Sequence, residues 1–352
     1  MMDGSLQFGV VHFYFYFHKV KKWQDRGYWI SKQYYWQSMV YYLYNAAKYR
    51  SLTYFSACNP ALSFGGMLAD DKTEAYKIIP DRYLPQTIIY NSDQNIKEQL
   101  AHRSIQFPVV VKPNMGYKGY AVQECTDLEN LEKYINELDH KKEWLIQEYV
   151  DHKCEYSIMY YRSPISDEYG ITSISDKKYP SVIGDASRSL NQLIDDYENA
   201  FIDKEYLKKK WEDDLAKTPS YKEEIQLHHI GNYSRGSKFN SSMNEKDDRL
   251  ALAMHNVFSG SDEIYFCRFD IKADSMEAVR NGDFKIMEIN GAKSEPLHIY
   301  DPQYGLFDRM KEVRKHWKLM TRIIDERRKQ GYQFPGNIAG LKSVQAVKSG
   351  VR

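Results

Sequence analysis

Short apolar runs bounded by glycine, proline or charged residues dominate the middle of this chain. Four of them have the length of a β-strand: 107–113, 121–125, 144–150 and 155–161. Residues 126–129 have the Ser/Thr-x-x-Glu form of a capping box, and leucine or isoleucine follows at helical spacing, at 128, 131, 135 and 138. The order strand, glycine-bearing turn, strand, helix, strand, strand predicts a compact α+β unit.

Further elements flank this unit on both sides. Residues 264–273 and 284–290 read as two late strands joined by a polar turn at 281–283. The stretch 32–50 contains neither Gly nor Pro and predicts a helix, as does 316–328. The polar stretch 185–224 has helical spacing and predicts a solvated helical segment rather than a binding patch. The Gly-rich polar residues from 330 onward predict a mobile tail.

Composition narrows the class of protein. The chain has 352 residues and a net charge of +1, so no strong field points to nucleic acid. Its four cysteines form no CxxC pair, which argues against a disulfide framework or a zinc site. No stretch reaches the roughly 20 apolar residues of a transmembrane helix, and the apolar run 8–17 lacks the flanks of a signal peptide. We expect a cytoplasmic protein.

The N-terminal region is unusually aromatic. Six tyrosine or tryptophan residues crowd together at 34, 35, 36, 41, 42 and 44. One interpretation is a helix packed on the body of the protein with its hydroxyl groups at the rim. The other is an interfacial surface that meets a membrane or an amphiphilic substrate, so the protein could also be membrane-associated. We further expect a homodimer.

Two groups of residues suit the binding of a nucleoside triphosphate. Lys112 ends a predicted strand, where it would be held rigidly, and Gly116-Tyr117-Lys118-Gly119 could bring backbone amides close to phosphates. Gln147, Glu148 and Val150 end the next strand and could read an adenine, while Glu155 could accept from ribose hydroxyls.

Three oxygen-bearing side chains lie in apolar strands, where a polar group needs a reason. Glu288 and Asn290 alternate and therefore point to one face of a strand, and Asp270 can face them from its neighbour. Such hard oxygen ligands suit Mg²⁺ or Mn²⁺ bridging phosphates. Arg268, two residues before Asp270, could counter charge on a transferring phosphoryl group, although a buried Arg–Asp ion pair is the alternative.

In this order, VVVKP, GYKG, LIQEYV with Glu155, RFD and MEING resemble the motifs of the ATP-grasp superfamily. The resemblance runs from about residue 72 to 301 and is to carboxylate–amine ligases such as D-alanine–D-alanine ligase. It implies an α+β ATP-grasp fold with a reduced, helical and aromatic N-terminal region (1–85), a small subdomain (86–152), a large subdomain with the metal site (153–329) and a tail (330–352).

The resemblance also implies roles. Lys112 would bind the α- and β-phosphates, and either Lys72 or Lys77 would be the earlier phosphate-side lysine. The glycine loop 116–119 would fold over the phosphates. Glu148 and Val150 would read adenine and Glu155 the ribose. Asp270, Glu288 and Asn290 would hold the metals, and Arg268 would stabilise the transition state of acyl transfer.

Residues 180–194 and 229–239 are similar to other amino-acid ligases of the superfamily, such as cyanophycin synthetase. By that resemblance Asn232, Ser234, Arg235 and Gly236 would line the carboxylate substrate, with Arg235 acting in catalysis. The chain departs from D-alanine–D-alanine ligase after the metal strand, where 291–301 replaces the Pro-Gly-Met turn. This departure argues against D-alanine as the acceptor.

The predicted function is a C–N ligase in which ATP activates a carboxylate as an acyl phosphate and an amine attacks it. Residues 291–301 would run beside the place where the amine attacks. Ser294 and His298 are therefore candidate substrate contacts, and Glu295 is a candidate for orienting the amine. Alternatively, Glu295 only pairs with Lys293 or Arg309. Two other functions stay open: an ATP-grasp kinase that stops at phosphorylation, and a nucleotide-binding protein without turnover.

Overall fold

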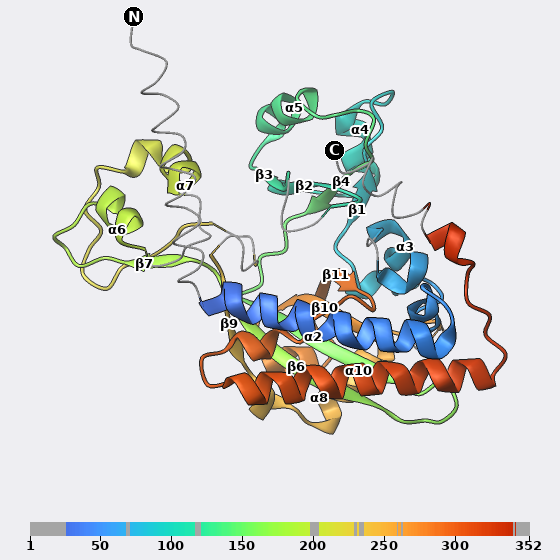
Figure 1. Ribbon diagram of the computed structural model, residues 1–352. Helices are drawn as coiled ribbons and strands as arrows, with labels where there is room; N and C mark the ends of the chain where they lie inside the picture. Colours follow the sequence, from blue (N-terminus) through green and yellow to red (C-terminus); the bar gives the residue numbers. More distant parts are fainter. Residues whose placement is uncertain are drawn as a thin grey trace, which may run out of the picture. The chain divides into compact units, whose positions relative to one another are not determined.

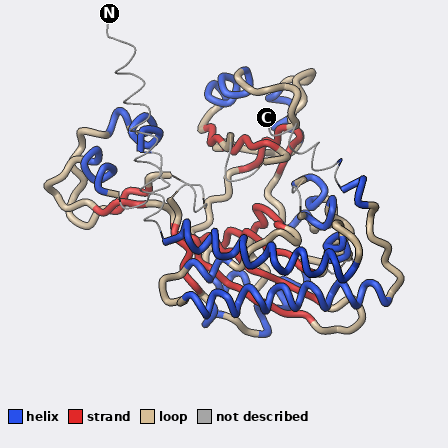
Figure 2. The backbone as a smooth tube through the Cα atoms, viewed as in Figure 1, coloured by secondary structure: helices blue, strands red, loops and turns tan. Residues whose placement is uncertain are grey.

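The computed structural model describes residues 26–67, 71–116, 121–197, 204–228, 231, 236–258, 260–261, 263–340 and 342. The chain forms two compact units, Met1–Trp36 with Lys177–Phe239, and Gln37–Asp176 with Asn240–Arg352. The small subdomain expected from the sequence (86–152) lies within the second unit, whereas the expected large subdomain (153–329) is divided between the two units, since 177–239 has a core of its own. Figures 1 and 2 show the elements.

The first sheet of the larger unit has four antiparallel strands in the order β1-β4-β2-β3. These are β1 (Thr87–Ile89), β2 (Val109–Pro113), β3 (Gln123–Cys125) and β4 (Trp144–Glu148). Helices α4 (Ile96–His102) and α5 (Leu128–Asn136) cover one face, and Val109, Val111 and Ile146 pack against them. The helix at 128 was predicted correctly, but its N-cap is Asp127, which accepts from the Asn130 amide, and not Thr126.

The second sheet has the order β11-β10-β5-β6-β9. Its strands are β5 (Cys154–Arg162), β6 (Tyr169–Lys178), β9 (Lys238–Ser241), β10 (Phe266–Ala273) and β11 (Lys285–Asn290). Apolar residues of β5 and β10 pack on helix α8 (Asp248–Asn256) and helix α9 (Met276–Arg280). One face of this sheet therefore forms the main core, and the other is left for polar side chains and further helices.

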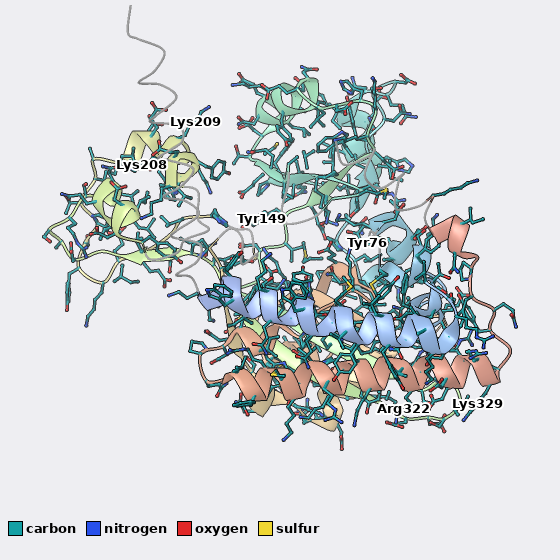
Figure 3. All side chains as sticks on the ribbon, in the orientation of Figure 1. Tyr76, Tyr149, Lys208, Lys209, Arg322 and Lys329 are labelled. Carbon is teal, nitrogen blue, oxygen red and sulfur yellow. The ribbon has the colours of Figure 1, made fainter. Side chains whose placement is uncertain are left out.

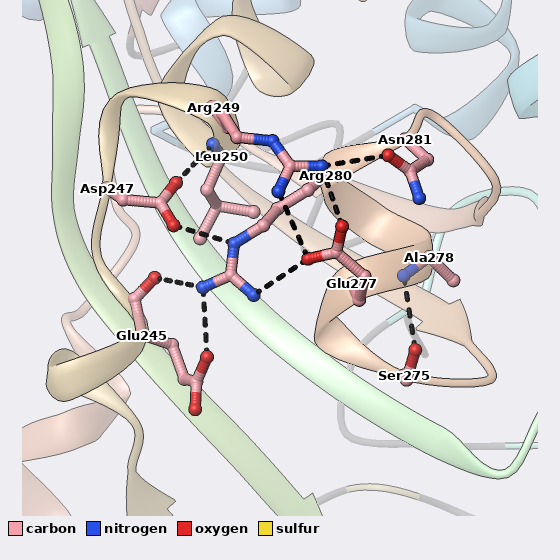
Figure 4. A network of polar contacts seen from close by, with 9 residues as sticks. All are labelled: Glu245, Asp247, Arg249, Leu250, Ser275, Glu277, Ala278, Arg280 and Asn281. Carbon is pink, nitrogen blue, oxygen red and sulfur yellow. Dashed lines mark hydrogen bonds and ion pairs between the residues drawn. The ribbon is translucent and has the colours of Figure 1, made fainter.

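Helix α9 was missed: the prediction placed only a polar turn between β10 and β11. Ser275 caps α9 by accepting from the Ala278 amide. Arg280, at its end, pairs with Glu245, Asp247 and Glu277 (Figure 4). The five-residue helix is too short to show apolar periodicity, which explains the omission.

The opposite face of this sheet carries helix α10 (Leu306–Lys329), which lies beside α2 (Arg26–Tyr49) (Figure 1). Contacts of Gln37 with Met310, Tyr41 with Trp317 and Lys48 with Asp325 show that the two run in the same direction. Helix α10 begins ten residues earlier than the predicted 316–328. The predicted mobile tail is wrong for its first part, because Thr53 donates to the Pro335 carbonyl and the Asn337 side chain accepts from the Leu52 amide.

Asn59 is fully buried and links the start of the larger unit to β10 through hydrogen bonds. Its side-chain amide donates to the carbonyls of Gly65 (3.0 Å) and Phe266 (2.8 Å) and accepts from two backbone amides, at 265 and 266. The 3-10 helices η1 (Tyr54–Cys58), η2 (Ser63–Gly66) and η3 (Asp81–Tyr83) and helix α3 (Lys72–Tyr76) complete this part of the unit. Segments far apart in sequence are thereby fixed to one another.

The smaller unit contains a two-stranded sheet of β7 (Ser181–Ile183) and β8 (Glu224–Gln226), with helices α6 (Leu190–Asp196) and α7 (Lys204–Lys210) and the 3-10 helix η4 (Glu212–Asp214). Leu190, Ile194 and Leu207 share its core. Lys208 and Lys209 of α7 are labelled in Figure 3. The sequence pattern predicted the helices of this segment but not its strands.

Within the residues described, no helix has both the length and the apolar character needed to cross a membrane. All four cysteines are free thiols. The 3-10 helices η6 (Met243–Glu245) and η7 (Leu297–Tyr300) lie in connections of the larger unit.

Candidate functional site

The four-stranded sheet turns Lys112 and Gln147 away from the face that α4 and α5 cover. In the pairing of β2 with β4, Val110 lies opposite Gln147, and Lys112 lies opposite Leu145. All four side chains therefore share the face that the helices leave uncovered. The Lys112 ammonium donates to the Gln147 side chain (2.8 Å) and to the Tyr76 hydroxyl (3.3 Å). Gln147 in turn donates to Tyr76 (3.2 Å) and to Thr87 (2.7 Å). Lys112 is therefore held in place by a buried polar network.

This network leaves Lys112 poised between two protonation states. Burial lowers the pKa of Lys112 to about 8, against the opposing charge of Glu288 on β11. Burial also raises the pKa of Tyr76 to about 12, so the phenol stays neutral. An anionic ligand beside Lys112 would restore its full positive charge. Gln147, predicted to touch the nucleotide, is fully buried and instead orients the lysine.

Lys72 lies near the same end of β2. Its ammonium donates to the carbonyls of Asn114 (2.9 Å) and Pro113 (3.3 Å), whereas Lys77 is exposed at the end of α3. Asn114 also donates to Asp71 (3.0 Å), which caps α3. The residues leading into Gly116 are thus fixed. Lys118 and Gly119 lie outside the described residues.

The connection from β4 to β5 forms a second polar cluster around Lys272 of β10. The Lys272 ammonium donates to the Val150 carbonyl (2.9 Å) and lies over the ring of Tyr149, which Figure 3 labels together with Tyr76. Lys272 is paired across the strands with Glu155, which is buried. Burial lowers the pKa of Lys272, against the charge of Glu155. The structure thus brings Val150 and Glu155 together, and Glu148 is partly buried at the end of β4.

The pairing of β10 with β11 brings the predicted metal ligands onto one face. Asp270 is opposite Glu288, and Arg268 is opposite Asn290. The Asp270 carboxylate accepts from Ser157 (2.5 Å), from Asn290 (3.3 Å) and from two nitrogens of Arg268 (3.2 Å each). Although burial disfavours its charge, Asp270, Glu295 and Glu288 hold the pKa of Arg268 above its usual range.

The donor set fits a hard cation. Asp270, Glu288 and Asn290 offer carboxylate and amide oxygens from adjacent strands, the chemistry that Mg²⁺ prefers. Among the described residues, no group of three or more His, Cys, Asp or Glu side chains is placed to hold a metal. Asn290 would supply an amide oxygen beside the two carboxylates. The Arg268–Asp270 ion pair, the alternative weighed from the sequence, is also present.

After β11 the chain makes a close approach to the Gly65–Gly66 turn. The Ala292 amide donates to the Gly65 carbonyl (2.8 Å), and a side chain on Gly291 would collide with that carbonyl. Gly65 and Gly66 both have positive φ angles, of 63° and 71°, which glycine adopts without strain. The hydroxyl of Ser294 closes the turn by donating to the Asn290 carbonyl (2.6 Å).

Of the remaining residues predicted for this passage, Glu295 lies next to Arg268. Its carbonyl accepts from the Arg268 guanidinium (3.3 Å) and its carboxylate from the Tyr300 hydroxyl (3.0 Å). His298 is buried, with one ring nitrogen 2.7 Å from the Ser173 hydroxyl and the other 3.7 Å from the Glu312 carboxylate. The structure therefore ties His298 to β6 and α10.

The predicted substrate residues of 229–239 fall largely outside the part of the chain that the structure describes. Asn232, Ser234 and Arg235 lie outside the described residues. Gly236 belongs to the smaller unit, where its carbonyl accepts from Tyr197 (3.2 Å).

Sequence reasoning missed three contributors: Tyr76, Ser157 and Lys272. A signal for Lys272 existed, because Arg268, Asp270 and Lys272 alternate along one strand and must share a face. Tyr76 follows Lys72 by four residues, one helical turn. Nothing local marks Ser157, since its role depends on the pairing of β5 with β10.

Residues 69–160 match the family of the RimK-like ATP-grasp domain. These residues belong to an ATP-grasp domain. The match takes in Lys72, Lys112, Gln147 and Glu155 and agrees with the resemblance of the motifs, so the α+β ATP-grasp fold expected from the sequence is confirmed.

Solved structures similar to this chain include a bifunctional glutathione synthetase from Pasteurella multocida (14% identity, TM-score 0.40), covering 70% of this chain and 35% of that one. A D-alanine–D-alanine ligase from Bacillus anthracis has 16% identity and a TM-score of 0.41, and the match covers 76% of this chain and 69% of that one. The VanG D-Ala:D-Ser ligase from Enterococcus faecalis has 12% identity and a TM-score of 0.40, and the match covers 73% of this chain and 61% of that one. This chain thus spans about a third of the glutathione synthetase. Likenesses this distant do not identify the substrates of this chain. No curated protein has a matching sequence.

Proposed function

We propose that this ATP-grasp protein is an ATP-dependent carboxylate–amine ligase that works through an acyl phosphate. The observation that carries the proposal is the alternation of charge across the site. The charge of Glu288 on one sheet stabilises the ammonium of Lys112 on the other, and Arg268 forms an ion pair with Asp270. Two cations and two carboxylates arranged this way suit a metal-bound triphosphate and a phosphoryl group in transfer.

Each residue then has a chemical task. Lys72 and Lys112 bind phosphate oxygens, and Glu155 with the Val150 backbone receives the nucleoside. Asp270, Glu288 and Asn290 would hold Mg²⁺, which when bound neutralises phosphate charge. Arg268 stabilises charge as the carboxylate oxygen attacks the γ-phosphorus and ADP leaves. An amine then attacks the acyl carbon and phosphate leaves. Buried surroundings exclude water, which would otherwise hydrolyse the acyl phosphate.

The proposed binding of the amine substrate depends on Glu295. Its carbonyl contacts Arg268 and its carboxylate contacts Tyr300, so the acid is held beside the cation that faces the acyl phosphate. An acid at this place suits an ammonium group, which it would orient and whose proton it would take before the neutral amine attacks. We therefore favour an amine donor that carries a positive charge.

The test is a pairwise screen of amino acids and small amines that measures ADP release. Hydroxylamine replaces the amine in a parallel series, because it traps an acyl phosphate as a hydroxamate. The proposal expects ADP release that depends on both substrates, and hydroxamate formation with the carboxylate alone. Asp270→Asn serves as the inactive control.

Two outcomes contradict ligation. ADP release that needs no amine and gives a stable phosphorylated product would identify a kinase. The absence of ADP release with every pair, despite measurable ATP binding, would leave a nucleotide-binding protein.

A further inference from the structure

Helices α2 and α10 expose a continuous apolar surface within the larger unit. Val40, Leu43 and Tyr44 of α2 are 66%, 58% and 65% exposed, and Phe307 of α10 is 81% exposed. Met39 and Met310 are also exposed. We call these six residues the apolar patch. Its two halves adjoin, because Gln37 and Tyr41, each three residues before a patch residue, contact Met310 and Trp317 of α10.

The apolar patch is large for a surface of a single chain. An aromatic side chain offers about 150–250 Å², so Tyr44 and Phe307 alone expose roughly 300 Å². The four aliphatic side chains bring the total above the few hundred Å² that folded proteins usually leave exposed. Exposed apolar surfaces of this size are typical of sites that bind a protein or a membrane.

Positive charge continues the apolar patch along α10. Lys311, Arg314 and Lys318 follow Phe307 at spacings of four, seven and eleven residues, which places them in one row, and all three are exposed. Among the described residues none pairs with these three cations. We call them the basic row.

The acidic residues of α10 do not cancel this charge, because each is engaged elsewhere. Asp308 accepts from the amide of Gly305 at the start of the helix, and Glu312 pairs with Lys315. Asp325 pairs with Lys48, and Glu326 accepts from Ser163. The surface beside the apolar patch is therefore cationic.

We propose that the α2–α10 surface docks on an anionic lipid bilayer. Tyrosine and phenylalanine side chains enter the interface between headgroups and acyl chains, while lysine and arginine meet lipid phosphates. Charge complementarity decides for a membrane over a second copy, because the basic row of one copy facing that of another would repel. The proposal is independent of the ligase chemistry.

The sequence before α2 has the same character. An aromatic run at 8–17 is followed by Lys19, Lys21 and Lys22. Membrane binding of such segments increases with apolar area and with attraction to anionic lipids. The full chain is therefore the protein to test.

The experiment is co-sedimentation of the full chain with phosphatidylcholine vesicles that contain no or 30% phosphatidylglycerol. We expect binding only to the anionic vesicles, and weaker binding at high salt. Leu43→Glu with Phe307→Glu should reduce binding at least tenfold. Charge reversal of the basic row should reduce it at least about 100-fold, since loss of each basic residue near an anionic surface alone removes about a fivefold factor.

Matched controls separate this surface from general effects. Leu252→Glu changes an exposed leucine on α8, which packs on the other face of the sheet. Charge reversal at Lys97 of α4, Lys133 of α5 and Lys141 before β4, all exposed, gives the same change in net charge. Both controls should bind like the wild type.

Three results would overturn the proposal. One is no binding to anionic vesicles. Another is equal loss in variants and controls, or undiminished binding in the patch variants. The third is a dimer in solution that Leu43→Glu with Phe307→Glu dissociates while vesicle binding stays absent, which would make this face an interface between two copies. Unchanged melting temperatures would show that the variants are folded.

Discussion

The protonation of Lys112 provides the sharpest test of the phosphate site. With a pKa of about 8, Lys112 is cationic at neutral pH and loses its proton as the pH rises through 8. ATP binds the cationic form. Affinity for ATP should therefore be nearly constant up to about pH 7 and should fall above pH 8, although the phosphates of ATP no longer titrate there.

The size of the effect is set by the pKa. One pH unit above it, about nine in ten free molecules carry a neutral lysine, and binding must restore the proton at a cost of about 1.4 kcal/mol. Affinity at pH 9 should thus be about tenfold lower than at pH 7. Glu288→Gln removes the charge that raises the pKa of Lys112, so the fall should begin at lower pH in that variant.

Calorimetric titration with a non-hydrolysable ATP analogue between pH 6.5 and 9.5 measures this profile. Lys112→Arg is the control, because a guanidinium keeps its charge throughout and should give a flat profile. A flat profile in the wild type, or the same slope in Lys112→Arg, would refute the role of the buried lysine.

Other changes test the site and the residues that support it. Asp270→Asn should lower turnover at least about a hundredfold while the melting temperature hardly changes, and near-wild-type kinetics would remove Asp270 from the metal set. Glu295→Gln should raise KM for the amine and leave KM for ATP unchanged, and equal effects on both would return Glu295 to a structural role. Asn59→Ala removes four hydrogen bonds between a buried side chain and backbone groups, so denaturant titration should show a loss of about 3 kcal/mol, and a loss below about 1 kcal/mol would contradict this account. Residues 114–120 should exchange amide hydrogen more slowly once an ATP analogue and Mg²⁺ are added, and unchanged exchange would argue against a closing loop.

The sequence predicted strands that are largely apolar. β2, β4, β5, β10 and β11 were all expected, since each contributes to a core whose period is visible locally. Strand β6 was not predicted, because its polar residues are also buried. Ser173 is hydrogen-bonded to His298, and Thr172 is hydrogen-bonded to His316 of α10. The partners lie more than a hundred residues away, so no local pattern shows why these residues are polar.

The candidate site was predictable to the same extent. Face-sharing on β10 and β11 placed Arg268, Asp270 and Asn290 correctly relative to one another, because strand geometry is local. The role of Gln147 was not visible, since it depends on Tyr76 of α3 lying against β4. Ligation itself, the identity of the amine and the homodimer stay predictions.

Strand β10 carries both the reactive side chains and the main core on its two faces. Arg268, Asp270 and Lys272 occupy one side, and Cys267, Phe269 and Ile271 the other. A single inserted or deleted residue would exchange these sets, burying three charges and removing the proposed metal ligand in one event. The strand is therefore constrained on both faces, whereas 291–301 contains no strand and would tolerate a change of length more readily.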